Sequence, residues 1–122
     1  MRATGFLAAG ADGPSVRARR ARRVVERLIG LVAQPLPVPG TGLWIEPCCA
    51  VHTFGVRGAL DLLFVSRSGE VLRVCADVPP RRVRTALRAR AVLELRAGEA
   101  GRLGLHAGMR FHWIDDPKGG ER

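Results

Sequence analysis

The sequence predicts a mainly β domain of the α+β class, either a compact β-sandwich similar to a jelly roll or a small barrel, with one N-terminal helix packed on it. Several short segments alternate apolar and polar residues between turns that contain glycine or proline, as β-strands do. Only one segment, residues 15–33, repeats apolar residues at helical spacing. The 122 residues, 47% hydrophobic and 25% charged, are enough for a single domain with its own core.

The predicted helix begins at Ser15, a favourable capping residue, and runs to about residue 33. Its apolar positions are Val24, Val25, Leu28, Leu31 and Val32. The pairs Arg19/Arg23 and Arg23/Arg27 place like charges four residues apart, which destabilises a helix. We therefore expect its first two turns to fray unless an anion or a partner covers them.

Two short strands are expected after the helix. Pro35, Pro37 and Pro39 end the helix, and Gly40 and Gly42 complete a stiff loop. Residues 43–45 and 51–56 then follow the period of β-strands. Gly55 and Gly58 indicate a bulge or a bend at the end of the second strand.

Residues 60–78 carry the clearest pattern, that of a β-hairpin. Leu60–Val65 is rich in strand-forming residues, Arg67-Ser68-Gly69 is a tight-turn sequence, and Val71–Val78 resumes the strand. Simple alternation places one set of side chains of the second arm on one face, namely Leu72, Val74, Ala76 and Val78. The other face then carries Arg73, Cys75 and Asp77.

The remaining segments complete a β-dominated domain over residues 15–114. After Pro79-Pro80 we expect a basic connector at 81–89, a strand at 91–96, a turn of helix and a loop at 98–105, and a last strand at 108–114. Residues 1–14, rich in alanine and glycine, are expected to be a flexible lead or a short edge strand. Residues 115–122 are expected to be a polar tail.

The charge is strongly positive and concentrated in two segments. Lysine and arginine number 20 against 11 acidic residues, a net charge of +9. Residues 17–27 and 81–90 hold six and five of these cations. The candidate polyanion-binding residues are Arg19, Arg20, Arg22, Arg23, Arg82, Arg84 and Arg88. Neither segment contains an aromatic residue for base stacking, so we expect a solvated basic face and no specific nucleic-acid partner.

The cysteines indicate thiols in a reducing compartment. Cys48, Cys49 and Cys75 are odd in number, and neighbouring cysteines rarely bridge each other. A possible export signal would have only Phe6 and Leu7 as its apolar core, so we expect a cytoplasmic protein, with export as the weaker alternative. No apolar run is long enough to cross a bilayer.

One group of polar residues could form a site in the middle of the chain: His52, Thr53, Arg57 and Asp61. Histidine and aspartate could pair as base and orienter beside a threonine nucleophile, and Arg57 could clamp a carboxylate or phosphate. The same residues could instead form a buried polar network, with His52 bonded to the backbone and Arg57 paired with Asp61 to stabilise the bend. We favour the network, and assign no catalytic residue.

Two further groups have both a functional and a structural interpretation. Cys48, Cys49, His52 and Cys75 offer donors that zinc prefers, but their spacing is poor, so we expect no metal and no cofactor. Phe111, Trp113, Ile114 and Trp44 could be core residues, or Trp113 could be exposed for a partner.

A set of residues spread over roughly residues 25–112 resembles the uncharacterised family called domain of unknown function 192. It comprises Arg27-Leu28-Ile29-Gly30-Leu31, Gly42-Leu43, Pro47-Cys48, Val51-His52-Thr53-Phe54, Arg57, Asp61, Phe64, Gly69, Val71, Pro80-Arg81, Leu93-Glu94-Leu95, Gly98 and Gly104-Leu105. The chain departs from the family at Val56, where methionine is usual, and at Met109, where aspartate is usual. The resemblance implies a compact β fold with a packed helix and no established activity. It adds Arg81 to the candidate ligand residues.

The predicted function is that of a small, non-enzymatic accessory or binding module with an unknown protein partner. The family resemblance alone suggests an association with envelope secretion or pilus machinery. The first alternative is a ligand-binding or hydrolytic domain that uses His52, Thr53, Arg57 and Asp61. The second is nonspecific polyanion binding through the arginine clusters. The observations lean against an enzyme.

Overall fold

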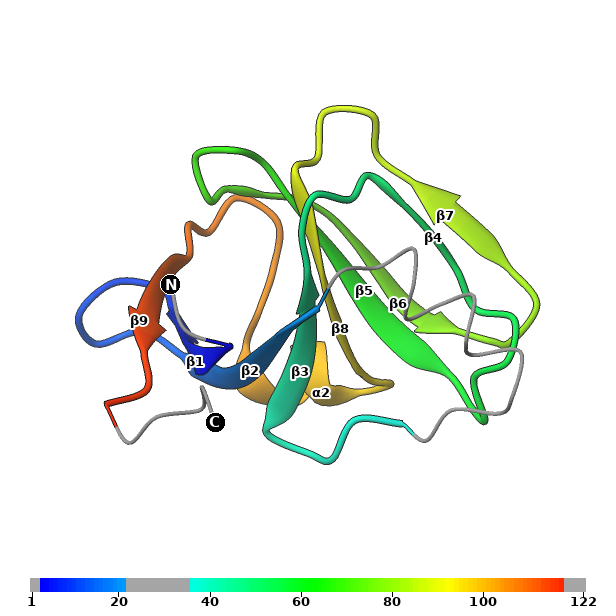
Figure 1. Ribbon diagram of the computed structural model, residues 1–122, viewed down its shortest axis with the longest axis horizontal. Coiled ribbons are helices and arrows are strands. Elements are labelled where there is room, and N and C mark those ends of the chain that lie inside the picture. Colours follow the sequence, from blue (N-terminus) through cyan, green and yellow to red (C-terminus); the bar gives the residue numbers. More distant parts are fainter. Residues whose placement is uncertain (1–2, 22–35, 118–122) are drawn as a thin grey trace.

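A computed structural model describes residues 3–21 and 36–117 and shows a mainly β protein, which confirms the predicted fold class at this level (Figure 1). The strands are β1 (Thr4–Ala8), β2 (Ser15–Ala21), β3 (Thr41–Ile45), β4 (Ala50–His52), β5 (Leu60–Val65), β6 (Val71–Val78), β7 (Val83–Thr85), β8 (Ala91–Arg96) and β9 (His112–Asp115). One short helix, α2 (Glu99–Leu103), follows β8. Seven strands form a mixed sheet in the order β6-β5-β8-β3-β2-β1-β9, and β4 pairs with β7 in a two-stranded ribbon.

The predicted N-terminal helix is wrong for residues 15–21, which form strand β2. Val16 and Ala18 are buried while Arg17 and Arg19 are exposed, the alternation of a half-buried strand. Of the arginines whose like charges disfavour a helix, Arg19 is described, and it lies with Arg17 on the solvent side of this strand. β2 pairs with β1 in antiparallel and with β3 in parallel orientation. The rest of the predicted helix, residues 22–33, lies outside the described residues.

Strand β1 occupies the segment for which we expected a flexible lead or a short edge strand. It is hydrogen-bonded on both sides, to β2 and to β9. Leu7 is 1% exposed, so this segment contributes to the core. At the other end of the chain, Asp116 is also buried and pairs with Arg17 over 2.7 Å, so the expected polar tail begins after it.

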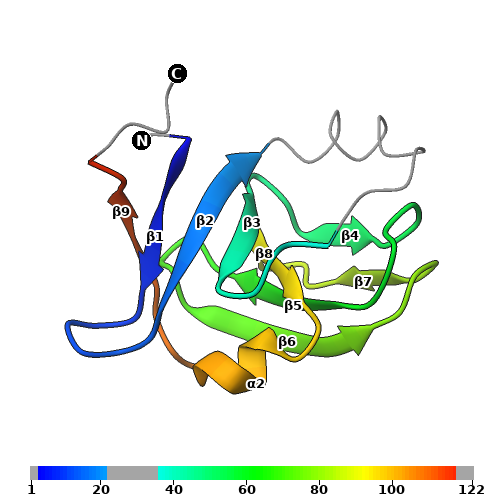
Figure 2. The same cartoon turned by 90° about the horizontal axis from the view of Figure 1, so that it is seen from below.

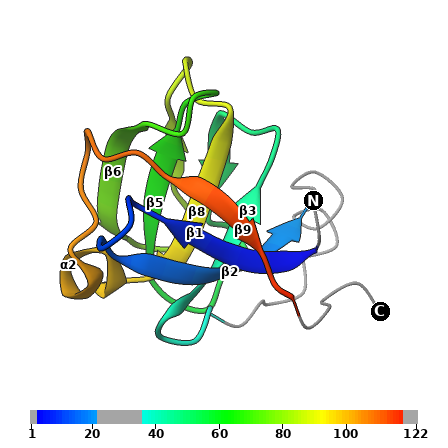
Figure 3. The same ribbon diagram turned by 90° about the vertical axis from the view of Figure 1, so that its left-hand side faces the viewer.

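The large sheet curls strongly without closing into a barrel. Figure 3 shows β1, β2 and β9 crossing in front of β5, β6 and β8. The segment just before β9 meets the start of β6, where Phe111 N donates to Gly69 O (2.8 Å) and Val71 N donates to Met109 O (2.8 Å). The two edges of the sheet are therefore joined at this one place.

The curl separates two apolar clusters, one on each face of the sheet. The inner core lies within the curl and is built from residues such as Leu7, Val16, Trp44, Leu63, Leu93 and Phe111. The outer core lies between the sheet and the β4–β7 ribbon and includes Ile45, Cys48, Val51, Phe64 and Val78. β5 and β8 are buried on both faces because they supply side chains to both cores.

The predicted hairpin is confirmed as β5 and β6, but the predicted faces of its second arm are wrong. Cys75 and Val78, three residues apart, both belong to the outer core, whereas Ala76 is exposed. The register slips by one residue between the pairs Leu60↔Val78 and Leu62↔Cys75. Asp77 takes a left-handed conformation (φ 56°) there, which is the signature of a β-bulge.

Helix α2 closes one end of the inner core, where Ala100 and Leu105 pack into it (Figure 2). The buried carboxylate of Glu99 ties the helix to the loop before β3. It accepts hydrogen bonds from Gly40 N (2.6 Å) and, through both oxygens, from the Arg102 guanidinium (2.6 and 2.8 Å). The Arg102 hydrogen bonds are the main reason that the pKa of Glu99 falls from 4.5 to about 2.

Glu99 should make stability depend on pH in acid. Because its pKa is lower in the folded than in the unfolded state, its stabilising contribution is complete above pH 4.5 and disappears as the pH falls towards 2. We expect Glu99→Gln to lower the free energy of unfolding by roughly 1–2 kcal/mol at pH 7. Urea unfolding at pH 7, 4 and 2.5 should show this difference shrinking.

The exposed Asp12 provides the matched control for this experiment, because Asp12→Asn also removes one carboxylate. The role assigned to the Glu99 carboxylate would be contradicted if the difference in unfolding free energy between Glu99→Gln and the unmodified protein stayed constant from pH 7 to pH 2.5.

Candidate functional site

The hydroxyl of Thr53, the nucleophile of the hydrolytic alternative, holds the end of β4 to the Pro79–Arg82 segment. Thr53 is fully buried, and its Oγ1 donates to Pro79 O (2.7 Å) and accepts from Arg82 N (2.9 Å). Its backbone N–H also donates to Arg82 O (2.9 Å). These bonds fasten the end of β4 to the Pro79–Arg82 segment, a structural task that occupies both the donor and the acceptor of the hydroxyl.

The carboxylate of Asp61 is likewise occupied by the main chain. Asp61 is 1% exposed, and its Oδ1 accepts from Asp77 N (2.8 Å) in the β6 bulge. Its Oδ2 accepts from Gly98 N (3.0 Å) and Ala100 N (2.9 Å) at the start of α2. Asp61 therefore connects the middle of β5 to two irregular backbone segments.

The other candidate ligand residues lie at the surface around this network. His52 is partly buried, and its ring lies 5.8 Å from that of Phe54. Arg57 is exposed, and Arg81 is exposed with a left-handed backbone (φ 65°). The structure thus brings Thr53 beside the Arg81–Arg82 loop, whereas the bonds of Asp61 lead to the bulge and the helix.

The described arginines of the two clusters lie on different sheets. Arg19 is exposed on β2, Arg20 is half-buried on the same strand, and Arg22 and Arg23 lie outside the described residues. In the second cluster, Arg82 and Arg88 are exposed, while the Arg84 guanidinium donates to Val83 O (2.9 Å). The large sheet carries Arg19 and Arg20 of the first cluster, and the β4–β7 ribbon with its flanking loops carries the second.

The cysteines are free thiols, two of them buried in the outer core. Cys48 Sγ donates to Ala50 O (3.1 Å), and Cys75 packs against apolar neighbours. Within residues 3–21 and 36–117, no three histidine, cysteine or acidic side chains gather as a metal site would require. In the same residues, no helix has the length and apolar character needed to span a bilayer.

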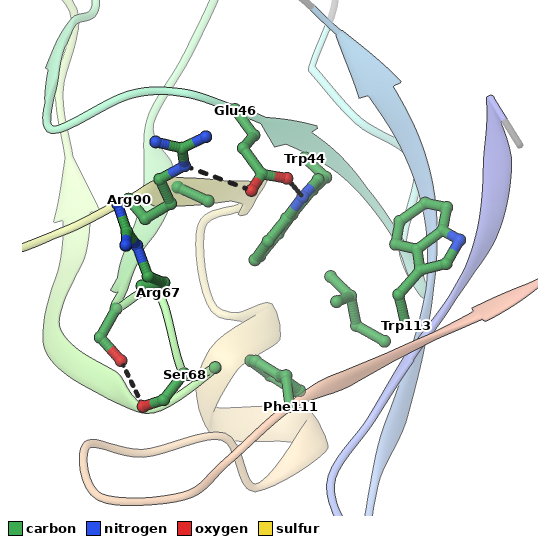
Figure 4. A pocket seen from close by; sticks show the side chains of 11 residues that line it. Trp44, Glu46, Arg67, Ser68, Arg90, Phe111 and Trp113 are labelled. Carbon is green, nitrogen blue, oxygen red and sulfur yellow. Dashed lines mark hydrogen bonds and ion pairs between the residues drawn. The ribbon is translucent and has the colours of Figure 1, made fainter. Parts of the chain in front are cut away.

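A pocket opens at the end of the inner core opposite α2, and we call it the mouth pocket. It lies where β3 and β5 end and β8 begins, and has a volume of about 180 Å³. Its lining residues are Leu7, Trp44, Glu46, Ser66, Arg67, Ser68, Gly69, Arg90, Ala91, Phe111 and Trp113. Figure 4 shows Trp44, Phe111 and Trp113 around its apolar part, with Glu46, Arg90 and Arg67 at its polar side.

The local strand patterns explain this mixed lining. On β3, Trp44 points into the inner core, and Glu46 follows two residues later on the same face, just beyond the strand end. On β2, Arg20 follows the buried Val16 and Ala18 in the same alternation. Each strand therefore presents apolar side chains inside the curl and a charged side chain where it reaches the opening.

Glu46 is the centre of a small charged cluster at the mouth pocket. Its Oε1 accepts from Trp44 Nε1 (3.0 Å) and lies 3.5 Å from the Arg20 guanidinium. Its Oε2 lies 3.6 Å from Arg90 Nε. The Arg20 guanidinium also lies 5.7 Å from the Trp113 ring centre, within the range of a cation–π contact.

The β5–β6 turn forms the lip of the mouth pocket. Gly69 N donates to Ser66 O (2.9 Å), and Ser66 Oγ accepts from Glu70 N (3.1 Å) and lies 3.0 Å from Ser68 Oγ. Gly69 has a positive φ of 92° and sits directly against the Phe111 carbonyl, where a side chain would collide. The turn is therefore held rigidly, with Arg67 at its exposed tip.

Sequence reasoning did not single out Glu46, Arg67 or Arg90, and it left Trp44 and Trp113 between a core and a partner role. The usable signal was the alternation on β3, which places a carboxylate on the same face as a buried tryptophan. Leu7 and Trp113, which face each other across β1 and β9, could not be brought together without knowing that pairing.

Comparisons with known proteins place the fold but not an activity. The chain is similar to a structure of a protein of unknown function from Novosphingobium aromaticivorans, with 24% identity, a TM-score of 0.74 and coverage of 90% of this chain and 84% of that one. It is also similar to a structure from Sinorhizobium meliloti that carries the name of a candidate transcription regulator. Here the identity is 20%, the TM-score is 0.74, and 90% and 91% of the chains are covered.

No curated protein matches the sequence. The model of the family DUF192, described as “Uncharacterized ACR”, matches residues 7–113, which is most of the chain and includes the strands that build the mouth pocket. The resemblance seen in the sequence is thereby confirmed, and the chain belongs to the uncharacterised DUF192 family.

Proposed function

We propose that the protein is a non-enzymatic binding module whose mouth pocket takes a small molecule. The observation that carries this proposal is the pocket itself, a recess of about 180 Å³ that combines aromatic and aliphatic side chains with charged and hydroxyl groups. Small-molecule sites commonly combine an apolar lining with a small number of placed polar groups.

The chemistry of the described groups supports binding rather than catalysis. Among the residues that line the mouth pocket, Glu46 is the one carboxylate, and it is already engaged by Trp44 and two arginines. No histidine or cysteine lines this pocket, and the lining hydroxyls of Ser66 and Ser68 lie 3.0 Å from each other in the β5–β6 turn. Thr53 and Asp61, the core of the hydrolytic alternative, are bound to main-chain groups instead.

The other predicted roles stay predictions. An association with envelope secretion or pilus machinery and a cytoplasmic location rest on the family resemblance and on the composition. Polyanion binding through Arg82, Arg84 and Arg88 would make retention on heparin fall steeply with salt. A pull-down from the native host would identify any protein partner that copurifies with this chain.

Tryptophan fluorescence gives a direct test of the mouth pocket. The chain has two tryptophans and no tyrosine, and both tryptophans line the pocket. Titration with one-ring compounds (benzoate, benzamide and benzyl alcohol) should change the emission in a saturable way for at least one of them.

Filling the pocket should abolish that response. Ala91 is buried and lines the pocket, so Ala91→Leu places a larger side chain against it. Ala76→Leu adds the same group at an exposed position of β6. Thermal unfolding verifies that both variants fold. An unsaturable response to every compound, or equal responses in Ala91→Leu and in the unmodified protein, would refute the proposed function.

A further inference from the structure

We infer that the mouth pocket selects a small organic monoanion, a carboxylate attached to an apolar body of about one planar ring. This inference rests on the proposed function and adds the chemical class of the ligand. It is built on three features of the pocket, namely an excess of guanidinium groups at the rim, the volume of the recess and its aromatic walls.

The rim of the mouth pocket has more positive than negative charge. Arg67 and Arg90 line the pocket and lie on the same side of it (Figure 4). Arg20 approaches Glu46 from β2. Glu46 is the single carboxylate among the lining residues. The nearby Asp115 does not line the pocket, and its Oδ1 accepts from Trp113 Nε1 (2.6 Å).

The guanidinium groups retain the capacity to bind an anion. Glu46 approaches Arg20 and Arg90 only at 3.5 and 3.6 Å, and it accepts its shorter hydrogen bond from Trp44 Nε1. Among the described residues, the side chain of Arg67 has neither a hydrogen bond nor an ion pair. Guanidinium groups bind carboxylates through paired N–H donors, so a ligand carboxylate between Arg67 and Arg90 would supply the missing negative charge.

The recess beneath these arginines limits the size of the ligand. An apolar protein cavity of about 150 Å³ accommodates benzene, so the 180 Å³ here suits one ring or a short branched chain. Trp44, Phe111 and Trp113 line the recess, so aromatic groups are available to contact a planar apolar body.

Glu46 favours a monoanion over a dianion. Its carboxylate stands in the same rim, so it repels a second negative charge on the ligand. A phosphate monoester would carry that second charge near neutral pH, whereas a carboxylate would not. The geometry therefore points to a carboxylate as the anionic group.

Four probes separate the contributions of ring and charge in the same fluorescence titration. Benzoate carries both, benzamide keeps the ring without the charge, acetate keeps the charge without the ring, and phenyl phosphate carries a dianion. We expect benzoate to bind most tightly. We also expect Arg67→Gln and Arg90→Gln each to weaken benzoate roughly tenfold, while changing benzamide binding by less than about twofold.

Arg57→Gln is the matched control, because it removes one exposed arginine that does not line the mouth pocket. Both test positions are exposed, so the variants should fold, which thermal unfolding verifies. Unchanged benzoate affinity in both variants, or an equal loss in Arg57→Gln, would overturn the assignment of Arg67 and Arg90.

The outcomes for the ligand class and for the proposed function are distinct. If benzamide bound as tightly as benzoate, the inferred preference for an anionic ligand would be refuted. The proposal that the mouth pocket binds a small molecule would still stand. If phenyl phosphate bound more tightly than benzoate, the assignment of a carboxylate would be refuted and a phosphate would be the preferred anionic group. A failure of every ring compound to bind would refute the proposed function together with this inference.

Discussion

Replacing Asp61 by alanine should lower the free energy of unfolding by roughly 3–5 kcal/mol. The carboxylate accepts hydrogen bonds from the main-chain amides of Asp77, Gly98 and Ala100 within 2.8–3.0 Å. Each buried donor left without an acceptor costs roughly 1–3 kcal/mol. Since domains of this size are stable by about 5–15 kcal/mol, the variant should be close to unfolding at 37 °C. Urea unfolding measures the loss.

Asp61→Asn keeps the shape of the side chain and tests the same bonds more gently. Its amide has one oxygen, so its NH₂ group must face at least one of the three main-chain donors. We expect a smaller loss than for alanine, with faster hydrogen exchange at Gly98, Ala100 or Asp77. Asp12→Ala, which removes an exposed carboxylate, should leave stability within about 0.5 kcal/mol. Stability of Asp61→Ala within 1 kcal/mol of the unmodified protein would disprove the assigned role.

The second large effect is expected for Gly69→Ala, with a loss of roughly 2–4 kcal/mol. The backbone of Gly69 has φ 92°, which alanine adopts only with strain. In addition, an added Cβ would collide with the carbonyl oxygen of Phe111, which belongs to the segment joined to the start of β6. The variant must therefore loosen the place where the two edges of the large sheet meet. Chemical unfolding and tryptophan emission report on both consequences.

Gly108→Ala separates the steric collision from the backbone strain. Gly108 has nearly the same φ, 95°, and hydrogen-bonds to Val71 O in the same joint, but nothing lies within 4 Å of an added Cβ. The excess loss in Gly69→Ala over Gly108→Ala measures the close approach to Phe111. Only Gly69→Ala should distort the lip of the mouth pocket and weaken benzoate binding. Equal losses of unfolding free energy in the two variants would show that the close approach of Gly69 to the Phe111 carbonyl is unimportant for stability.

The fold was predictable from the sequence where strand patterns are local. Leu60–Val65 and Val71–Val78 carry a turn between two β-rich runs, and the structure has the hairpin there. The faces of β6 were not predictable, because the bulge at Asp77 depends on Asp61, sixteen residues earlier. Strand β2 was missed because the helical spacing of residues 24–32 was extended back to Ser15, where Val16 and Ala18 in fact alternate with arginine.

The candidate site was predictable only in part, because local patterns can be read from the sequence but contacts between distant segments cannot. Thr53 and Asp61 stand out in the sequence as polar residues that a β core must satisfy, and both are hydrogen-bonded to main-chain groups. The network interpretation expected Asp61 to pair with Arg57, whereas the bonds of Asp61 go to the main-chain amides of Asp77, Gly98 and Ala100. The mouth pocket collects side chains from β1, β3, the β5–β6 turn, the start of β8 and β9. Such a gathering depends on strand pairings between distant segments, which periodicity alone does not reveal.

The pairing of the first strand with the last one has a consequence for how the protein is made. Leu7 lies opposite Trp113, so this part of the sheet consists of contacts of very high sequence separation. Such contact order slows folding, because the entropy of closing a long loop is lost before the contacts form. On the ribosome, β1 and β2 can pair early, but β9 is synthesised after all the other strands of the sheet. Until then, one wall of the mouth pocket is missing and β1 remains an open edge that needs protection from other unfolded chains.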